Sequence, residues 1–155
     1  DVRGLVGRVC DVCRPKAEEE GVSLTKDFSP EPMIAAIDAV CMERALTNLV
    51  TNAIEASRKG QNVTLSVLND SVNVAIKITD HGEGMDEETL ENIFTPFYSR
   101  KATGTGLGMA IAKKIIDEHE GEIVIHSELG KGTEITVTLP VGRPEKVQDA
   151  QQENL

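Results

Sequence analysis

The chain contains no tryptophan and only four other aromatic residues, three Phe and one Tyr, among its 155 residues. These few aromatics are not spread evenly, because Phe94, Phe97 and Tyr98 fall within five positions. We expect the three side chains to anchor a loop against the rest of the domain. A small satellite hydrophobic cluster is the alternative interpretation, and it is compatible with the first.

Positive charge is also scarce, since 16 Lys and Arg stand against 26 Asp and Glu and give a net charge of −10 at pH 7. This charge argues against nucleic acid as the main partner, and a polyanionic ligand would need local cations, backbone amides or a metal ion. No hydrophobic run is long enough to span a membrane, and no secretory signal is visible at the start. We expect a cytoplasmic, monomeric domain without direct membrane contact. Because the first residue is Asp1, we expect a fragment of a longer protein, whose own membrane attachment the sequence leaves open.

Cysteine is limited to three residues, and an odd number in a long chain favours a reducing compartment over a disulfide framework. Cys10 and Cys13 form a C-x-x-C inside a predicted helix, with no second pair and no strand before it. We therefore interpret them as packing or surface residues, and not as a zinc or redox site. The three histidines share no metal-ligand spacing, and we expect His119 in the last turn of a helix, where partial positive charge is favourable.

Apolar residues at helical spacing predict long helices at 2–20, 39–58 and 107–120, with Gly21, Gly60 and Gly121 as their stops. Alternating patterns predict strands at 22–28, 63–67, 74–78, 123–127 and 133–139, and 33–37 is a further short candidate. This order predicts a two-layer α/β sandwich, an α+β fold. Its sheet is mixed, mostly antiparallel and of about five strands, covered on one face by three helices. Residues 1–140 would form one domain, and the polar, aperiodic residues 141–155 a disordered tail.

Between residues 81 and 105 lies a long irregular stretch, broken only by a short acidic helix predicted near residues 86–93. Irregular segments of this length inside a compact domain are usually functional. We interpret this stretch as a lid, which would carry the aromatic cluster between its two ends.

The helix at 39–58 carries Asn48 and Asn52 four residues apart, on a polar stripe with Arg44 and Glu55 and beside an apolar stripe. Two short amides held in one line next to a core suit a metal ion and its phosphate ligands. The alternative, two Asn on a solvated face, is favoured if the helix is considered alone.

A second motif, Asp80-His81-Gly82-Glu83-Gly84-Met85, follows a predicted strand. An Asp at a strand end can accept a hydrogen bond from an exocyclic amine, and the two glycines allow a ligand ring to approach the backbone. An ordinary Asp and Gly turn is the alternative.

The third motif, Gly104-Thr105-Gly106-Leu107-Gly108, opens directly into a helix, whose free N–H groups and positive dipole end favour phosphate. Nearby cations strengthen this interpretation over that of a flexible hinge, namely Arg100, Lys101, Lys113 and Lys114. The sequence has no G-x-x-x-x-G-K-[ST], which excludes a P-loop protein. A lid and not a strand precedes the glycines, which excludes a dinucleotide fold. Val74-Ala75-Ile76-Lys77 resembles a kinase strand motif but lacks the companion motifs, so we expect Lys77 to face solvent.

Taken in order, an N-x-x-x-N-A helix, D-x-G-x-G, a Phe-rich lid and G-x-G-x-G resemble the ATP-binding family shared by sensor histidine kinases, DNA gyrase, a heat-shock chaperone and mismatch-repair ATPases. The likeness is greatest to the catalytic domain of a bacterial two-component histidine kinase, and it covers residues 1 to about 140. It implies the Bergerat fold, ATP and Mg²⁺ as cofactors, a phosphoacceptor and dimerisation domain as partner, and a response regulator downstream.

The resemblance also implies roles for individual residues. Asn52 is similar to the Mg²⁺ ligand, Asn48 to a second polar contact to metal or phosphate, and Asp80 to the partner of the adenine amine. Asn48, Asn52 and Lys101 form the implied catalytic set. The remaining nucleotide-binding positions that it implies are Gly82, Gly84, Met85, Phe94, Arg100, Gly104, Thr105, Gly106, Leu107, Gly108, Met109 and Thr133.

Two departures bear on the chemistry. Many family members carry a basic residue and an aromatic where this chain has Glu55 and Ala56, although a subset that resembles nitrogen-regulation kinases also has small residues there. Hydrolytic relatives place a Glu where this chain has Asn48, and an amide cannot act as a base for water. We therefore expect phosphoryl transfer to a protein histidine over hydrolysis.

Three functions remain open at this point. The first is the ATP-binding domain of a sensor histidine kinase, separated from its acceptor helices, because none of the three histidines has the acceptor context. A stand-alone serine kinase of the anti-sigma-factor type, which doubles as a partner-binding module, is the second. The third is a degenerate domain that binds nucleotide only as a structural element.

Overall fold

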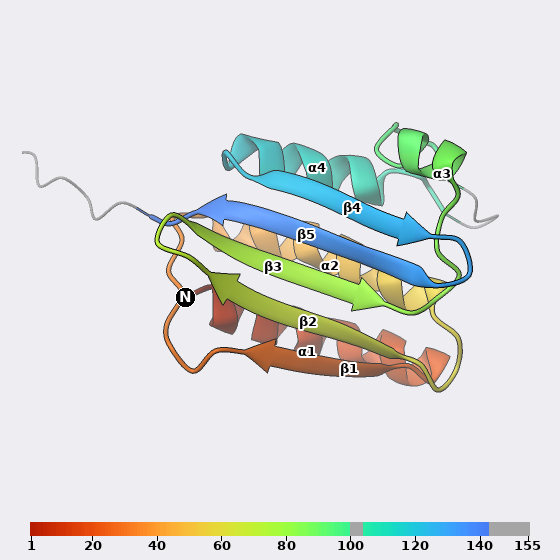
Figure 1. The fold of residues 1–155 in the computed structure, drawn as a ribbon, viewed down its shortest axis with the longest axis horizontal. Coiled ribbons are helices and arrows are strands. Elements are labelled where there is room, and N and C mark those ends of the chain that lie inside the picture. Colours follow the sequence, from red (N-terminus) through yellow and green to blue (C-terminus); the bar gives the residue numbers. More distant parts are fainter. Residues whose placement is uncertain (100–103, 143–155) are drawn as a thin grey trace, which may run out of the picture.

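A computed structural model describes residues 1–99 and 104–142 of the chain. Its centre is a five-stranded sheet in the order β1-β2-β3-β5-β4, built from β1 (Ser23–Phe28), β2 (Asn62–Asn69), β3 (Asn73–Asp80), β4 (Glu122–Glu128) and β5 (Gly132–Pro140). The strands β1 and β2 are parallel, and all other neighbours are antiparallel. Figure 1 shows the twisted sheet. The mixed, mostly antiparallel sheet confirms the predicted fold class.

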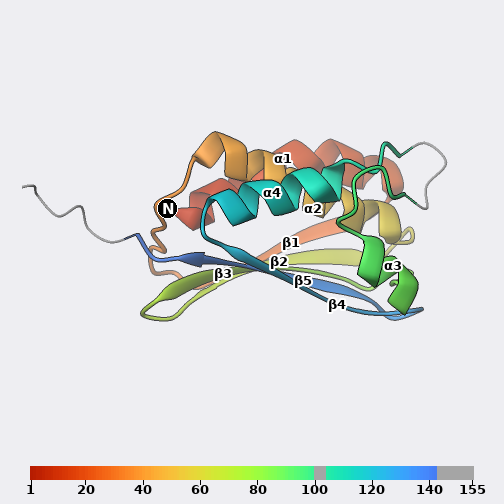
Figure 2. The ribbon, with the colours of Figure 1, turned by 90° about the horizontal axis from the view of Figure 1, so that it is seen from above.

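Three long helices pack together on one face of this sheet, as Figure 2 shows. They are α1 (Val2–Glu20), α2 (Ala39–Ala56) and α4 (Gly108–Glu118), and a short helix, α3 (Glu87–Asn92), lies at one end. The start of α2 is capped by the Asp38 carboxylate, which accepts the N–H groups of Val40 and Cys41. The Asp86 carboxylate caps α3 in the same way by accepting the N–H of Thr89. Among the described residues, no helix is both long and apolar enough to cross a membrane.

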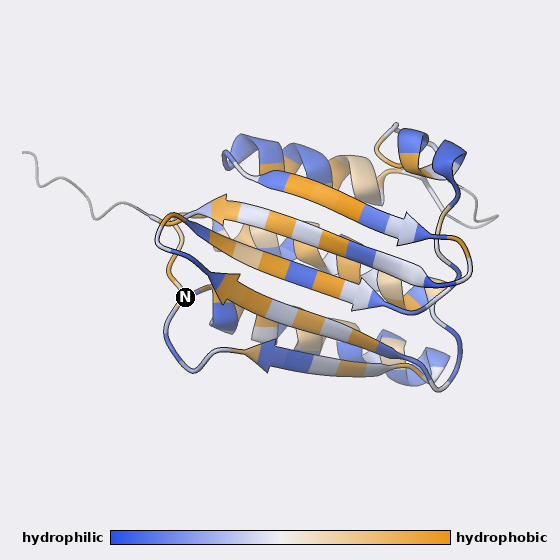
Figure 3. Cartoon of the chain, in the orientation of Figure 1, coloured by the Kyte–Doolittle hydropathy of each residue, from blue (hydrophilic) through white to orange (hydrophobic). Residues whose placement is uncertain are grey.

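The core lies between the helical layer and the sheet. Alternate residues of β2 and β3 point to the helices and are fully buried, among them Leu65 and Ile76, and Figure 3 shows this alternation as hydrophobic and hydrophilic bands along the central strands. The apolar stripe of α2 faces them, with Leu46 and Leu49 buried. Burial of each such side chain stabilises the fold by about 1.5–3 kcal/mol. Cys10 and Cys13 are buried in the same core, and burial raises the pKa of both thiols.

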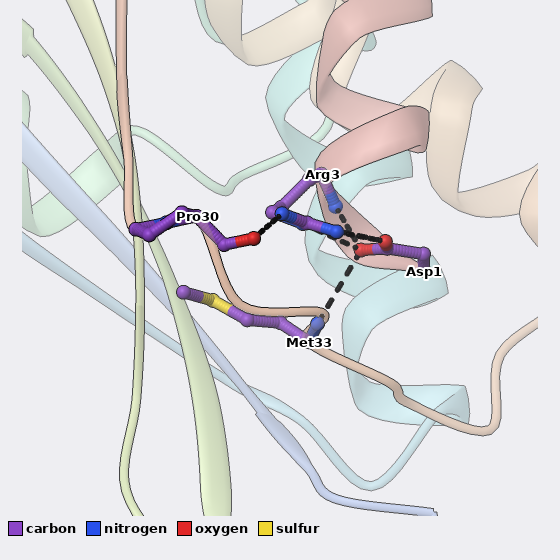
Figure 4. Close-up of polar contacts among 4 residues, drawn as sticks. All are labelled: Asp1, Arg3, Pro30 and Met33. Carbon is purple, nitrogen blue, oxygen red and sulfur yellow. Dashed lines mark hydrogen bonds and ion pairs between the residues drawn. The ribbon is translucent and has the colours of Figure 1, made fainter.

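The start of α1 is fixed to the segment that leads into α2, as Figure 4 shows. The Asp1 carboxylate accepts the backbone N–H groups of Arg3 at 3.0 Å and of Met33 at 3.4 Å. The Arg3 guanidinium pairs with Asp1 at 2.8 Å and donates to the carbonyl oxygen of Pro30. These contacts hold the start of α1 against the segment between β1 and α2, at the end of the molecule away from α3 (Figure 2).

Three predicted segment boundaries differ from the structure. The candidate strand at 33–37 is not a strand, because only Ala35 forms a bridge, to Val141. The helix α2 ends at Ala56, two residues before the predicted end at Arg58, and the Ala56 carbonyl accepts the N–H of Glu83 from another segment. The predicted tail at 141–155 begins too early, because the N–H of Val141 donates to Val72 within the fold; the rest of that tail, from residue 143, lies outside the described residues.

His119 follows α4 as its C-cap and does not lie in the last turn. Its Nδ1 lies 2.7 Å from the carbonyl oxygen of Ile115, and its Nε2 accepts the backbone N–H of Asp38 at 3.0 Å. The side chain therefore connects the end of α4 to the start of α2.

Candidate functional site

A cavity of about 330 Å³ opens at the end of the domain where β3 ends, β5 begins and α4 begins. In Figure 1 this is the right-hand end, where α3 also lies. Ten of the residues predicted to bind the nucleotide line this one cavity: Asn52, Asp80, Gly84, Met85, Gly104, Thr105, Gly106, Gly108, Met109 and Thr133. Segments that are far apart in the chain therefore meet around a single space.

The helix α2 contributes Asn52 to the wall, together with Ala53, Glu55 and Ala56 from its last turn. Asn48, one turn earlier, lies beside the cavity and not in its lining. Its amide nitrogen donates to the carbonyl oxygen of Gly108 at 3.3 Å, which joins α2 to the first residue of α4. The two amides thus have different surroundings in this structure, although they share one helical face.

Asp80 is the last residue of β3 and is only 5% exposed. One of its carboxylate oxygens accepts the backbone N–H of Gly82 at 2.9 Å. Burial raises the pKa of Asp80 above its ordinary value, and the N–H groups of Gly82 and Thr133 partly oppose this rise because they favour the charged form. A buried carboxylate at the cavity wall can accept a hydrogen bond from a ligand amine.

The segment after Asp80 follows a path that its glycines make possible. Gly84 has a φ of 66°, and a Cβ there would run into the carbonyl of Glu128 in β4. Gly82 lies behind the wall, where a Cβ would run into the carbonyl of Ala56, and it does not line the cavity. The turn between β4 and β5 supports this segment, because the N–H of Gly130 donates to Glu83 at 2.7 Å.

Thr133, at the start of β5, pairs directly with Asp80 across the sheet. Its hydroxyl oxygen lies 2.7 Å from that of Ser127 in β4. The Ser127 hydroxyl also accepts the backbone N–H of Met85 at 2.8 Å. Two lining residues, Thr133 and Met85, are thus held by one serine that does not itself line the cavity.

The glycine-rich segment closes the cavity from the side of α4. Gly106 has a φ of 70°, and a Cβ there would meet the backbone of Phe97 and Tyr98. This close approach allows the N–H of Phe97 to donate to Gly106 at 3.0 Å. The first N–H groups of α4 lie at this point, and such groups favour anions. No side chain caps this helix, because its N-cap is Leu107.

The remaining predicted site residues lie elsewhere. Leu107 does not line the cavity, and Phe94 lies outside it, with the Lys113 ammonium 5.7 Å from its ring centroid. Arg100 and Lys101 fall outside the described residues. Of the aromatic cluster, only Tyr98 lines the cavity, whereas Phe97 is 76% exposed.

Sequence reasoning missed several lining residues, namely Ala53, Glu83, Thr89, Ile93, Tyr98, Ser99 and Ile135 as ligand contacts. Ile93 and Ile135 continue the apolar patterns of their segments, so nothing in the sequence separates them from core residues. Tyr98 could have been found, because it is the only Tyr in the chain and lies in the predicted lid.

The metal-ligating oxygens near the cavity suit a hard cation that takes most of its other ligands from water and from the phosphates of a bound substrate. Among the described residues, no group of three or more His, Cys, Asp or Glu could enclose a metal ion by itself. The amide oxygen of Asn52 is a suitable single ligand for Mg²⁺, which usually binds one or two protein oxygens together with substrate phosphates. The residues present therefore fit this metal only in company with a phosphorylated ligand.

Comparisons with known proteins agree with this geometry. The family described as "Histidine kinase-, DNA gyrase B-, and HSP90-like ATPase" matches residues 37–143. Sporulation kinase C of Bacillus subtilis is 43% identical over 100 residues, which are 64% of this chain and 23% of that protein. Curated relatives are much longer, and the chain spans between 14% and 34% of their lengths.

Two solved structures extend the likeness to the fold. The catalytic domain of histidine kinase ThkA, in a nucleotide-free form, superposes with a TM-score of 0.80 at 28% identity, over 90% of this chain and 94% of that chain. Full-length ShkA in complex with AMPPNP gives a TM-score of 0.81 at 27% identity, over 93% of this chain and 31% of that chain. Because the family match covers more than half of the sequence, the chain belongs to the histidine kinase-, DNA gyrase B- and HSP90-like ATPases, as a catalytic domain of the histidine kinase type.

Proposed function

We propose that this domain binds Mg²⁺–ATP in the cavity and supplies the γ-phosphoryl group to a histidine on a separate phosphoacceptor and dimerisation domain. The observation that carries the proposal is the meeting of Asn52, Asp80 and the Gly104–Gly108 segment around one space. Each supplies what a different part of ATP needs: an amide oxygen for the metal, a carboxylate for the base amine and backbone N–H groups at a helix start for phosphate.

Each residue of the site has its own role in binding the nucleotide. Asp80 accepts from the exocyclic amine, and Gly84 and Met85 border the base. The N–H groups from Thr105 to Met109 face the phosphates, and Lys101, with Arg100, adds positive charge there. Asn52 would hold Mg²⁺, which would neutralise part of the phosphate charge when bound. Catalysis then rests on positioning and electrostatic stabilisation, as is usual for phosphoryl transfer.

Transfer is preferred to hydrolysis because of Asn48. Its amide nitrogen donates to Gly108, and an amide has no basic group with which to deprotonate water. An imidazole acceptor brings its own lone pair and needs no strong base. A two-component response regulator would receive the phosphoryl group in turn. A cytoplasmic location belongs to the same proposal, and the three free cysteines are consistent with it.

Isothermal titration calorimetry of the chain with ATP, with and without Mg²⁺, tests the first step. We expect binding that strengthens with Mg²⁺ and almost no steady phosphate release. The second step is tested by adding a separately purified acceptor domain from the same parent protein and labelled ATP. Label should appear on histidine, where it is acid-labile; acid-stable label on serine would instead support a serine kinase. Steady hydrolysis without any acceptor would contradict the proposal.

A further inference from the structure

Gln61 lies between the turn that follows α2 and the start of β2, and it is half-buried. Its side-chain oxygen accepts the backbone N–H of Arg58 at 2.7 Å, and its side-chain nitrogen donates to the carbonyl oxygen of His81 at 2.9 Å. These partners fix which way the amide points, because a backbone N–H can only donate and a carbonyl can only accept. Gln61 therefore connects the turn after α2 to the segment after Asp80, although it does not line the cavity itself.

The carbonyl of His81 belongs to the same peptide group as the N–H of Gly82. That N–H donates to the Asp80 carboxylate at 2.9 Å. A peptide group is planar, and in its trans form the carbonyl and the N–H point in opposite directions. The bond from Gln61 and the bond to Asp80 are therefore made by the two ends of one rigid unit, and each bond depends on the orientation that the other requires.

This peptide group needs a partner on its carbonyl side because the backbone next to it can rotate. Gly82 has no Cβ, and glycine permits backbone conformations that other residues resist. The following peptide group is held separately, since the N–H of Glu83 donates to the carbonyl oxygen of Ala56 at 3.1 Å. Gln61 and Ala56 thus hold two successive peptide groups of the segment, and Gln61 holds the one that contacts Asp80.

We propose that Gln61 is a positioning residue that keeps the peptide group between His81 and Gly82 oriented so that its N–H holds the Asp80 carboxylate in place. The consequence for nucleotide binding rests on the proposed function, in which this carboxylate accepts from the base amine, whereas the effect on Asp80 itself does not. The N–H of Thr133 also stabilises the Asp80 carboxylate, and it comes from β5, away from Gln61. Loss of the Gln61 donor should therefore loosen Asp80 without releasing it.

Two variants of Gln61 and one control separate the hydrogen bond from charge. Gln61→Met has nearly the same length and removes both side-chain hydrogen bonds without a change of charge. Gln61→Glu keeps an oxygen for Arg58 but replaces the donor with a second oxygen, which the His81 carbonyl repels. Lys59→Gln is the matched control for Gln61→Glu, because it makes the net charge more negative by the same amount at a nearby exposed position.

The first measurements need no nucleotide. The Gly82 N–H favours the charged form of Asp80 and so opposes the rise in pKa that burial causes. Loss of that bond in Gln61→Met should therefore raise the pKa of Asp80 further, as measured by NMR titration of its carboxyl carbon. Amide exchange at Gly82 should become about fivefold faster. His81 and Glu83 also act on Asp80 through their charges, and neither changes in this variant.

Calorimetry with Mg²⁺–ATP measures the consequence for binding. We expect the affinity to fall about fivefold in Gln61→Met and at least as much in Gln61→Glu, and to change less than about twofold in Lys59→Gln. A merely structural role for Gln61 would lower the stability of both variants in urea but leave the pKa of Asp80 and the exchange at Gly82 as in wild type.

The inference is overturned if Gln61→Met keeps the wild-type pKa of Asp80 or the wild-type exchange rate at Gly82. A raised pKa with unchanged ATP affinity would overturn the part that concerns binding. If Gln61→Met does not fold, Gln61→Glu keeps the contact with Arg58 and allows the same measurements, with Lys59→Gln as its reference. If wild type does not bind ATP, the proposed function fails, but the titration and the exchange still test the role of Gln61.

Discussion

The side-chain nitrogen of Asn48 lies 3.3 Å from the carbonyl oxygen of Gly108 and donates a hydrogen bond to it. This bond connects the middle of α2 to the first residue of α4, which begins at the glycine-rich segment. Because one of its two amide N–H groups is engaged, the direction of the Asn48 amide is set, and its oxygen and its second N–H remain for a ligand. The contact thus sets both the orientation of Asn48 and the position of the helix start that we propose to face phosphate.

Asn48→Asp should weaken the fold more than Asn48→Ala does. The alanine loses one hydrogen bond, worth about 1 kcal/mol, whereas the aspartate places a negative oxygen against the Gly108 carbonyl and should cost about 1–3 kcal/mol. Urea unfolding of both variants measures the difference. Asn69→Asp, at an exposed position near the end of β2, adds the same charge without such a contact and should change stability little. Equal stability of Asn48→Asp and Asn48→Ala would contradict the close approach of this side chain to the Gly108 carbonyl, and an Asn48→Ala as stable as wild type would show that the bond is unimportant.

Asn52→Ala should remove the dependence of ATP binding on Mg²⁺. Asn52 lines the cavity and is the amide that we propose as metal ligand, so its loss should weaken Mg²⁺–ATP binding by at least about tenfold. Calorimetry at several Mg²⁺ concentrations measures this change. Asn69→Ala is the matched control and should bind as wild type does. A variant that keeps the Mg²⁺ dependence would assign the metal to other groups.

Asp80→Asn should weaken binding of ATP and change the pH dependence of stability. Burial raises the pKa of Asp80 in the folded protein above the unfolded value of about 3.9. The folded state therefore holds this proton more tightly, so ionisation of Asp80 costs stability above the raised pKa. That cost disappears as the pH falls through the raised pKa towards the unfolded value.

We therefore expect Asp80→Asn to gain stability relative to wild type at pH 7 and to lose this advantage as the pH falls towards 4. Thermal unfolding across that range measures the trend, and calorimetry with ATP at pH 7 should show an affinity at least about tenfold lower. A variant that is more stable than wild type but binds ATP more weakly would show that Asp80 serves ligand recognition and not folding. An advantage that grows as the pH falls would contradict the assigned shift.

Gly106→Ala should reduce nucleotide affinity more than its backbone strain alone explains. Gly106 and Gly130 both have positive φ, 70° and 81°, which costs alanine about 1 kcal/mol at either site. A Cβ at Gly106 meets the backbone of Phe97, whereas nothing lies within 4 Å of one at Gly130. Gly106→Ala should speed amide exchange at Phe97 and weaken ATP binding, and Gly130→Ala should do neither. Similar binding by the two variants would mean that the contact with Phe97 does not shape the site.

Much of the fold could be predicted because its elements are strongly periodic. The alternation in 74–78 and the apolar stripe of α2 identify the buried faces, and the order of helices and hairpins predicts a mixed sheet covered on one face; the order of the strands within the sheet comes from the structure. Local pattern failed where a distant segment decides the outcome. At the end of α2, the N–H of Glu83 donates a hydrogen bond to the carbonyl of Ala56. Residues 33–37 form no strand, because only Ala35 forms a β-bridge, to Val141.

The polar residues of the candidate site could also be predicted from local sequence features. Asn52, Asp80 and the glycines are unusual in their positions, so they attract attention in the sequence. Ile93 and Ile135 have the same pattern as core residues, and only the folded structure places them at a cavity. Ser127 looks like any polar residue of an edge strand until its contacts with two lining residues are seen.

All three long helices cover the same side of the sheet, and within the described residues the opposite side carries no helix (Figure 2). Its central positions are small or polar, such as Ser66, Thr136 and Thr138. A fluorophore attached at Ser66 would be separated from the nucleotide by the full thickness of the sheet. This surface therefore offers a place for a reporter or for attachment to a sensor chip that leaves ligand binding intact.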